Sequence, residues 1–216
     1  MSTSILAHIP AGHATIEGML EVPARAIGLV LFAHGSGSSR HSPRNNHVAG
    51  VLRQAGVGTL LMDLLTPEED RDYDRRFDIA LLTQRLLDAT RWAVSQPATG
   101  ELPLGFFGAS TGAAAAIEAA AILDADARAV VSRGGRPDLA SRQALTTVTA
   151  PTLLLVGGFD DVVIDLNQRA YDQLHCKKEL VIVPGATHLF EEPGTLEEVA
   201  RQAAAWFAKH LPAKMI

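Results

Sequence analysis

The stretch LPLGFFGASTGAAAAIEAAA, residues 102–121, decides the fold. It opens with a short apolar run, Leu102–Phe107, that is typical of a buried strand. It leads into Ala113–Ile122, a run rich in alanine, which has the highest helix propensity. Only five residues separate the two, so the chain turns directly from a strand into a helix. Strands joined by helical crossovers form the parallel sheets of α/β proteins.

The rest of the chain shows the same alternation. Ile5–Ile9 and Ala14–Val22 alternate in part between apolar and polar residues, which favours an antiparallel pair at a half-exposed edge, joined by a turn at residues 10–12. Further buried strands are expected at Ile27–Ala33, Gly58–Met62, Ala129–Ser132, Thr152–Val156 and Leu180–Val183. Apolar spacing predicts the remaining helices, at Asn46–Ala55, Ile79–Val94, Leu166–Leu174 and Leu196–His210.

This pattern predicts one α/β domain over residues 1–216, with a doubly wound, mainly parallel sheet and an antiparallel N-terminal edge. The charged stretch Thr66–Asp78 is interpreted as a solvated loop that leads into a helix. The segment between Ser132 and Thr152 is too short for a large cap domain. In such sheets, ligands bind at the carboxyl ends of the strands.

The composition narrows the class of protein. Hydrophobic residues make up 47% of the chain, enough for a sizeable core, and a net charge of −5 argues against nucleic-acid binding. No signal-peptide pattern and no apolar run of about 18 residues is present. A lone cysteine, Cys176, gives no internal disulfide. We expect a cytoplasmic protein that acts on a small molecule and binds no membrane, and a homodimer is compatible with the sequence.

Gly108-Ala109-Ser110-Thr111-Gly112 follows the pattern G-x-S-x-G between a predicted strand and a predicted helix. In that context the pattern indicates a sharp turn that exposes a nucleophilic serine oxygen, and the small flanking residues let neighbouring backbones pass. The alternative is that Ser110 is the N-cap of an ordinary helix. We favour the nucleophile, because candidates for the acid and the base follow in the required order, Ser, Asp, His.

The base candidate is His188. Of the three histidines after Ser110, His175 lies in a polar segment and His210 beside Lys209 near the C-terminus. His188 alone follows a predicted strand on a loop, and the alternative is an ordinary surface histidine.

The acid candidate lies in the loop after the strand TLLLV, where Asp160 and Asp161 are adjacent. We choose Asp160 and expect Asp161 to cap a helix or face solvent, while Asp165 is the expected N-cap of the next helix. The acid would orient the imidazole of the base and stabilise its charged form.

With these residues in place, the chain resembles the dienelactone hydrolase-like proteins of the α/β-hydrolase superfamily over nearly its whole length. The resemblance rests on Gly108–Gly112, Gly157–Val163 and Pro184–Gly194. It also rests on Ala33–Asn45, which is similar to small hydrolases of which some are fused to phosphoribosyltransferase domains. The family's acid falls on Asp160. Dienelactone hydrolases carry cysteine where this chain has Ser110, so the resemblance implies ester or lactone hydrolysis more generally.

A tetrahedral intermediate needs donors for its negative oxygen. One is expected from the backbone N–H of Thr111 and the other from the loop after Ile27–Ala33, where related loops place it on Ser36. The alternative is a flexible glycine-rich turn. We interpret His34 as structural, holding this loop by a hydrogen bond.

Substrate contacts are the least determined part of the prediction. Arginines after strand ends could meet an anionic group of the substrate, although exposed loops commonly carry arginine; these are Arg40, Arg44, Arg133 and Arg136. Leu189 and Phe190 are expected to form a wall of the site. His41 and His47 do not support a metal site, and we expect no metal or organic cofactor.

The sequence thus predicts two-step acyl transfer from an ester or lactone to Ser110 and then to water. Two alternatives stay open: acyl transfer to another acceptor such as peroxide or an alcohol, and a non-catalytic ligand-binding module on the same fold.

Overall fold

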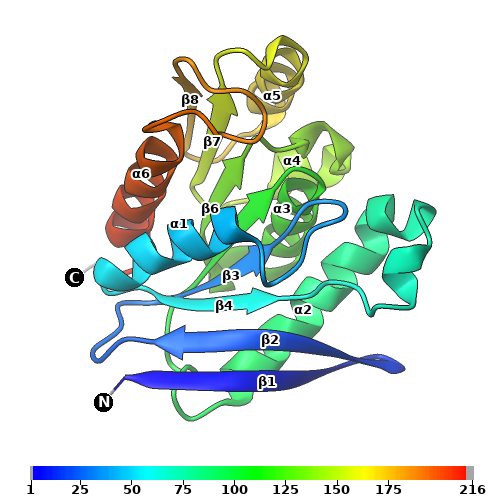
Figure 1. The fold of residues 1–216 in the computed structure, drawn as a ribbon, viewed down its shortest axis with the longest axis vertical. Helices are drawn as coiled ribbons and strands as arrows, with labels where there is room; N and C mark the ends of the chain where they lie inside the picture. The colour runs from blue at the N-terminus through cyan, green and yellow to red at the C-terminus, as the bar shows by residue number, and fades with distance from the viewer. Residues whose placement is uncertain (1, 213–216) are drawn as a thin grey trace.

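Within residues 2–212, eight strands form one sheet in the order β1-β2-β4-β3-β5-β6-β7-β8 (Figure 1). The structure is a computed structural model and describes residues 2–212. β2 pairs antiparallel with β1 and β4, and all the other pairs are parallel. The predicted mainly parallel sheet with an antiparallel N-terminal edge is therefore confirmed. The strands are β1 Thr3–Ala11, β2 Ala14–Val22, β3 Leu29–Ala33, β4 Gly58–Met62, β5 Leu104–Ala109, β6 Ala127–Arg133, β7 Thr152–Gly157 and β8 Lys178–Val183.

Helices cover both faces of the sheet (Figure 1). One core cluster packs α1 and α6 against one face, and the other packs α2 to α5 against the opposite face. Between β6 and β7 the chain holds only η4 and α4, so there is no large cap domain at this point. The helices are α1 Pro43–Gln54, α2 Ile79–Ser95, α3 Thr111–Leu123, α4 Arg142–Thr147, α5 Asp161–Gln173 and α6 Thr195–His210, with short 3₁₀ turns at η1 Glu69–Arg71, η2 Asp74–Phe77, η3 Asp124–Asp126 and η4 Pro137–Leu139.

The register of the parallel strands brings their carboxyl ends to one edge. Gly108 near the end of β5 pairs with Ala33 at the end of β3 and with Ser132 of β6. Gly157 at the end of β7 pairs with Val183 at the end of β8. The loops that follow these strands therefore open side by side. Next to this edge, Phe32 of β3 and Phe107 of β5 stack with their ring centroids 4.8 Å apart, in the core cluster that contains α1 and α6.

The structure departs from the sequence prediction most in three segments: α4, the start of α5 and the charged stretch Thr66–Asp78. Helix α4 was not predicted. Helix α5 begins at Asp161 rather than at Leu166, because β-branched residues at 162–164 disguise its first turn. Asp165 is consequently an exposed residue inside α5 and not its N-cap.

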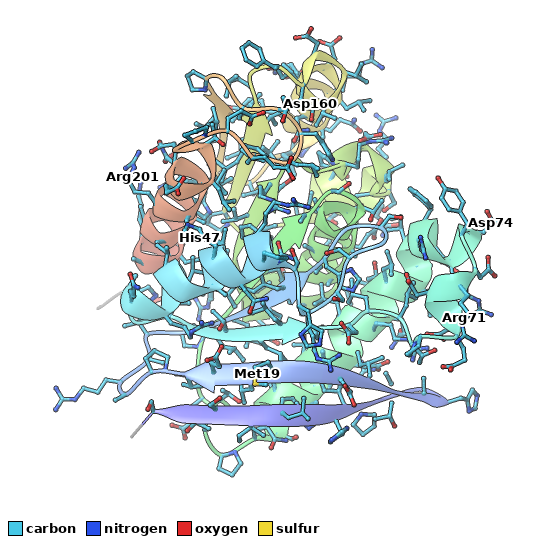
Figure 2. The ribbon with its side chains drawn as sticks, viewed as in Figure 1. Met19, His47, Arg71, Asp74, Asp160 and Arg201 are labelled. Carbon is cyan, nitrogen blue, oxygen red and sulfur yellow. The ribbon has the colours of Figure 1, made fainter. Side chains whose placement is uncertain are left out.

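The charged segment Thr66–Asp78 is more ordered than the predicted loop, since it contains η1 and η2. Its labelled residues Arg71 and Asp74 are exposed and point away from the sheet (Figure 2). The segment is thus a solvated surface with local helical structure.

Candidate active site

Ser110 joins β5 to α3 in a conformation that non-glycine residues rarely adopt, with φ at +50° and ψ at −122°. Such a strained residue persists only where the surroundings fix it, and strain of this kind clusters at functional sites. Its side chain makes no capping hydrogen bond to α3. The N-cap alternative therefore does not explain Ser110.

The two glycines that flank Ser110 are required by close backbone approach. A Cβ atom at Gly108 would lie 2.4 Å from the Cα atom of Ala113. A Cβ atom at Gly112 would lie 2.1 Å from the carbonyl oxygen of Ala33 at the end of β3. The tight turn, rather than a flexible loop, is why small residues occupy both positions.

Asp160 and His188 form a direct pair. The imidazole Nδ1 of His188 lies 2.6 Å from a carboxylate oxygen of Asp160, so Nδ1 carries the hydrogen and donates it. Asp160 occupies the N-cap position of α5 but makes no capping bond there, because its carboxylate is turned to the imidazole (Figure 2 labels Asp160). Asp161 is exposed, as expected. The Nε2 atom of His188 is left for another partner.

The turn after β6 links the nucleophile candidate to the base candidate. The backbone N–H of Ser110 donates to the carbonyl of Arg133 at 3.3 Å. The next residue, Gly134, sits under the histidine loop: a Cβ atom there would lie 3.0 Å from the His188 carbonyl oxygen and 3.7 Å from its Cε1 atom. Within residues 2–212, no hydrogen bond joins the Ser110 hydroxyl to His188.

The loop that carries His188 is held by a neighbouring carboxylate. Glu192 accepts hydrogen bonds from the backbone N–H of Thr187 at 3.0 Å and from the Thr187 hydroxyl at 2.6 Å. These bonds lower the pKa of Glu192.

Leu189 is 41% exposed, whereas Phe190 is buried in the core at a φ of +56°. Phe190 therefore supports the loop from below and does not form the predicted wall.

The loop after β3 lies against Ser110. A Cβ atom at Gly35 would lie 2.9 Å from the Cβ atom of Ser110. His34 anchors this loop as predicted: its Nδ1 atom donates to the Gly35 carbonyl at 2.9 Å, and its Nε2 atom accepts from the Leu64 N–H at 3.0 Å. Burial lowers the pKa of His34, which favours this neutral form.

The two residues predicted to stabilise a negative oxygen have different surroundings. Thr111 is buried at the first position of α3, where backbone N–H groups are free of intrahelical partners. Ser36 is exposed on the loop next to Gly35. Sequence reasoning missed the neighbours of this loop: Asp70 and Arg76 from the charged segment line a small cleft with Ser36 and Thr111.

The four candidate arginines differ in their hydrogen-bond and ion-pair partners. Arg40 is bound to Asp63 and Glu17, so it is an anchor of its loop and not a free substrate contact. Arg136 is paired with Asp138 through two bonds of 2.8 Å. Arg44 pairs with Glu191 at 2.9 Å. Arg133 is buried, and its side chain makes no hydrogen bond or ion pair with any described residue.

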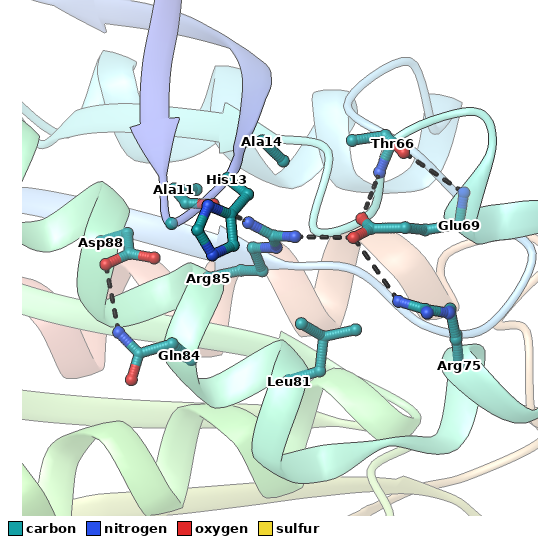
Figure 3. A pocket seen from close by; sticks show the side chains of 11 residues that line it. Ala11, His13, Ala14, Thr66, Glu69, Arg75, Leu81, Gln84, Arg85 and Asp88 are labelled. Carbon is teal, nitrogen blue, oxygen red and sulfur yellow. Dashed lines mark hydrogen bonds and ion pairs between the residues drawn. The ribbon is translucent and has the colours of Figure 1, made fainter.

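A separate hollow of about 540 Å³ lies where the β1–β2 turn meets α2 (Figure 3). Arg85 crosses it, bonded to the carbonyl of Ala11 and to Glu69. These bonds fasten the antiparallel edge to the charged segment. In residues 2–212 no group of three or more metal-ligating side chains gathers. None of the helices in that range combines the length and the apolar composition that a membrane span requires.

Comparison with known proteins places the chain in a family. No protein-family model matches it. A dienelactone hydrolase from Anabaena variabilis ATCC 29413 is 53% identical with a TM-score of 0.93, over 97% of this chain and 99% of that one. The esterase domain of a Rhodothermus marinus protein shares the fold, with 16% identity and a TM-score of 0.76 over 98% of this chain and 99% of that one.

Two curated proteins from Mycobacterium tuberculosis strains, both carrying a provisional phosphoribosyl transferase name, are 60% identical over 203 residues. The match covers 94% of this chain but 46% of theirs, so the chain spans about half the length of these relatives. The Anabaena protein, by contrast, is matched from end to end. The chain therefore belongs to the dienelactone hydrolase-like family of α/β-hydrolases.

Proposed function

We propose that the chain is a serine hydrolase that cleaves carboxylic esters or lactones of small molecules. The observation that carries the proposal is the strained, uncapped Ser110 at the same sheet edge as the Asp160–His188 pair. A serine hydroxyl is a poor nucleophile unless a base takes its proton. Here the Nδ1 atom of the base candidate donates to a carboxylate, and its Nε2 atom has no partner within residues 2–212.

In the proposed first step, Nε2 of His188 removes the proton as the Ser110 oxygen attacks the carbonyl carbon. The carbonyl π bond opens to a negative oxygen, which the backbone N–H groups of Thr111 and Ser36 stabilise. His188 then protonates the departing alcohol, and an acyl-enzyme remains. Loss of one such N–H donor typically costs about 10²–10³ in turnover.

In the second step His188 activates water, which attacks the acyl-enzyme and releases the acid. Asp160 keeps the imidazole in the tautomer that leaves Nε2 free to accept a proton. The Ser110–His188 bond must form during this cycle. In many enzymes such bonds are long at rest and shorten in the complex with substrate.

The experiment is hydrolysis of an activated nitrophenyl ester by the wild-type chain and by Ser110→Ala. We expect a pre-steady-state burst of nitrophenol in the wild type that is absent from the variant. A fluorophosphonate should label the wild-type chain at Ser110. An alanine variant with full activity, or a wild type that never forms the adduct, would overturn the assignment. Adding peroxide or an alcohol and identifying the products separates hydrolysis from acyl transfer.

A further inference from the structure

Arg133 is an unusual arginine. It is the last residue of β6, it is 8% exposed, and its Nε and Nη1 atoms are buried without a partner among residues 2–212. The chain also shows how the terminal nitrogens of a buried structural arginine are satisfied. Arg85 is 6% exposed, and its two terminal nitrogens bind a carboxylate and a backbone carbonyl. Arg133 has the burial of Arg85 without its partners.

The backbone of Arg133 lies beside the nucleophile candidate. Its Cα atom is in register with that of Ala109, the residue before Ser110, and its carbonyl accepts from the Ser110 N–H. Side chains alternate along a strand, so Arg133 lies on the same face of the sheet as Val131, which packs with α1 and α6. The guanidinium group is therefore at the carboxyl edge, on the side of α1.

A second cation, the guanidinium group of Arg44, lies on the same side of the sheet. Arg44 is the second residue of α1. Burial, and after it the positive charge of Arg44, lower the pKa of Arg133 to about 10. The Nη1 atom of Arg44 binds Glu191, three residues after His188, while its Nε atom is buried and unpartnered. Two guanidinium groups thus converge between the start of α1 and the loop of the base.

This arrangement is costly for the folded chain alone. Burying an unpaired charge is unfavourable, and a like charge nearby adds repulsion. Arg133 stays charged at neutral pH despite both effects. A guanidinium group presents N–H donors in a rigid fork that matches carboxylate and phosphate oxygens. An anionic ligand would supply both the missing acceptors and the missing charge.

We propose that Arg133 and Arg44 form an anion subsite that binds a carboxylate or phosphate group carried by the ester or lactone substrate. That the anion belongs to an ester or lactone substrate rests on the proposed function, but anion binding itself can be measured without turnover.

The binding test uses the Ser110→Ala chain with glutarate and, separately, inorganic phosphate, followed by thermal shift and calorimetry. We expect at least one anion to bind and to raise the unfolding midpoint. The affinity should fall about ten- to hundredfold in Arg133→Met, the range for charge-assisted hydrogen bonds. The control is Arg128→Met, an exposed arginine on the same strand, β6. The tighter anion identifies the group. No binding by either anion, or equal binding in Arg133→Met, overturns the proposal.

The kinetic test compares mono-nitrophenyl glutarate and nitrophenyl 4-phosphooxybutanoate with neutral nitrophenyl valerate. We expect kcat/KM in the wild type to favour an anionic ester, and that preference to fall about ten- to hundredfold in Arg133→Met. A merely structural Arg133 would lower kcat/KM for all esters and leave their ratio unchanged, which would contradict the proposal. If Arg133→Met does not fold, Arg44→Gln carries the same test.

The two proposals fail differently. A wild type that binds glutarate or phosphate but hydrolyses none of the three esters refutes the proposed function and leaves the subsite standing. A wild type that hydrolyses all three without preference refutes the subsite alone.

Discussion

The Gly112→Ala variant should unfold more easily than the wild type, although helix propensity alone predicts the opposite. Gly112 is the second residue of α3, and replacing glycine by alanine inside a helix ordinarily stabilises by about 0.5–1 kcal/mol. Here the new Cβ atom would lie 2.1 Å from the Ala33 carbonyl oxygen and 2.6 Å from that of His34. A carbon–oxygen contact normally needs about 3.3–3.6 Å, so the backbone at the end of β3 must move by roughly 1 Å.

The magnitude follows from what has to move. Overpacking a core typically costs about 1–3 kcal/mol, and the cost rises when main chain rather than a flexible side chain is in the way. The backbone in question belongs to a central strand and continues into the loop that His34 anchors. We therefore expect a net loss of about 3 kcal/mol, which for a chain of this length lowers the unfolding midpoint by about 6–12 °C.

A matched control lies in the other helix that borders the site. Gly50 is inside α1, and the nearest atom to a Cβ there is the Arg53 Nη2, 3.9 Å away. Gly50→Ala should raise the midpoint by about 1–4 °C. The assay is urea and thermal unfolding of both variants beside the wild type, with ester hydrolysis at a temperature where all three are folded. If Gly112→Ala is as stable as Gly50→Ala, the close approach of α3 to β3 is wrong.

Three further outcomes are expected. Asp160→Asn should lower kcat/KM for an activated ester by about 10³–10⁴-fold, because the amide no longer holds the imidazole in the right tautomer, while the urea midpoint stays near the wild-type value. Glu192→Gln should lower kcat about three- to tenfold with KM unchanged, since it weakens the bonds that hold Thr187 beside the base; an equal rise in KM would point to a lost substrate contact instead. The pKa of His34 is lower in the folded chain than its ordinary value, so the unfolded chain binds more protons, and the free energy of unfolding should fall as the pH drops from about 6.5 towards that lowered pKa. His34→Gln should lose this part of the pH dependence in urea titrations, and a wild type with the same slope as the variant would contradict the assignment.

The sheet and the strand-to-helix turn at Ser110 could be predicted from the sequence because their signals are local. Continuous apolar runs mark strands that are buried on both faces, and the direct strand-to-helix turn around Ser110 fixes how β5 meets α3. The Asp160–His188 pair was also within reach, because parallel strands bring the loops that follow them to one edge. The start of α5 was not, because its β-branched first turn resembles the end of a strand.

The roles of the arginines could not be predicted, because they depend on which carboxylates the fold brings within reach of each guanidinium group. Arg40 resembles Arg44 in the sequence, yet it is bound to Asp63, which directly follows β4, and to Glu17 of β2. Arg136 lies three residues from Arg133 and is satisfied by Asp138 two residues further on. What separates Arg133 from these is the absence of a carboxylate within reach among the described residues, and a sequence does not display an absence of that kind.

The sheet edge itself is where the chain departs most from the rules that build the rest of it. Positive φ alone does not mark function, since Arg25 and Asp124 have it in turns elsewhere. At this edge, however, three such features meet: the strained Ser110; Asp160, an N-cap residue whose carboxylate binds an imidazole instead of its helix; and Arg133, whose Nε and Nη1 atoms are buried without a partner among the described residues. Each feature lowers the stability of the fold by itself. Their gathering at the carboxyl ends of β5, β6 and β7 is explained when all three serve one bound molecule: Ser110 attacks its carbonyl, Asp160 orients the base that assists the attack, and Arg133 meets its anionic group.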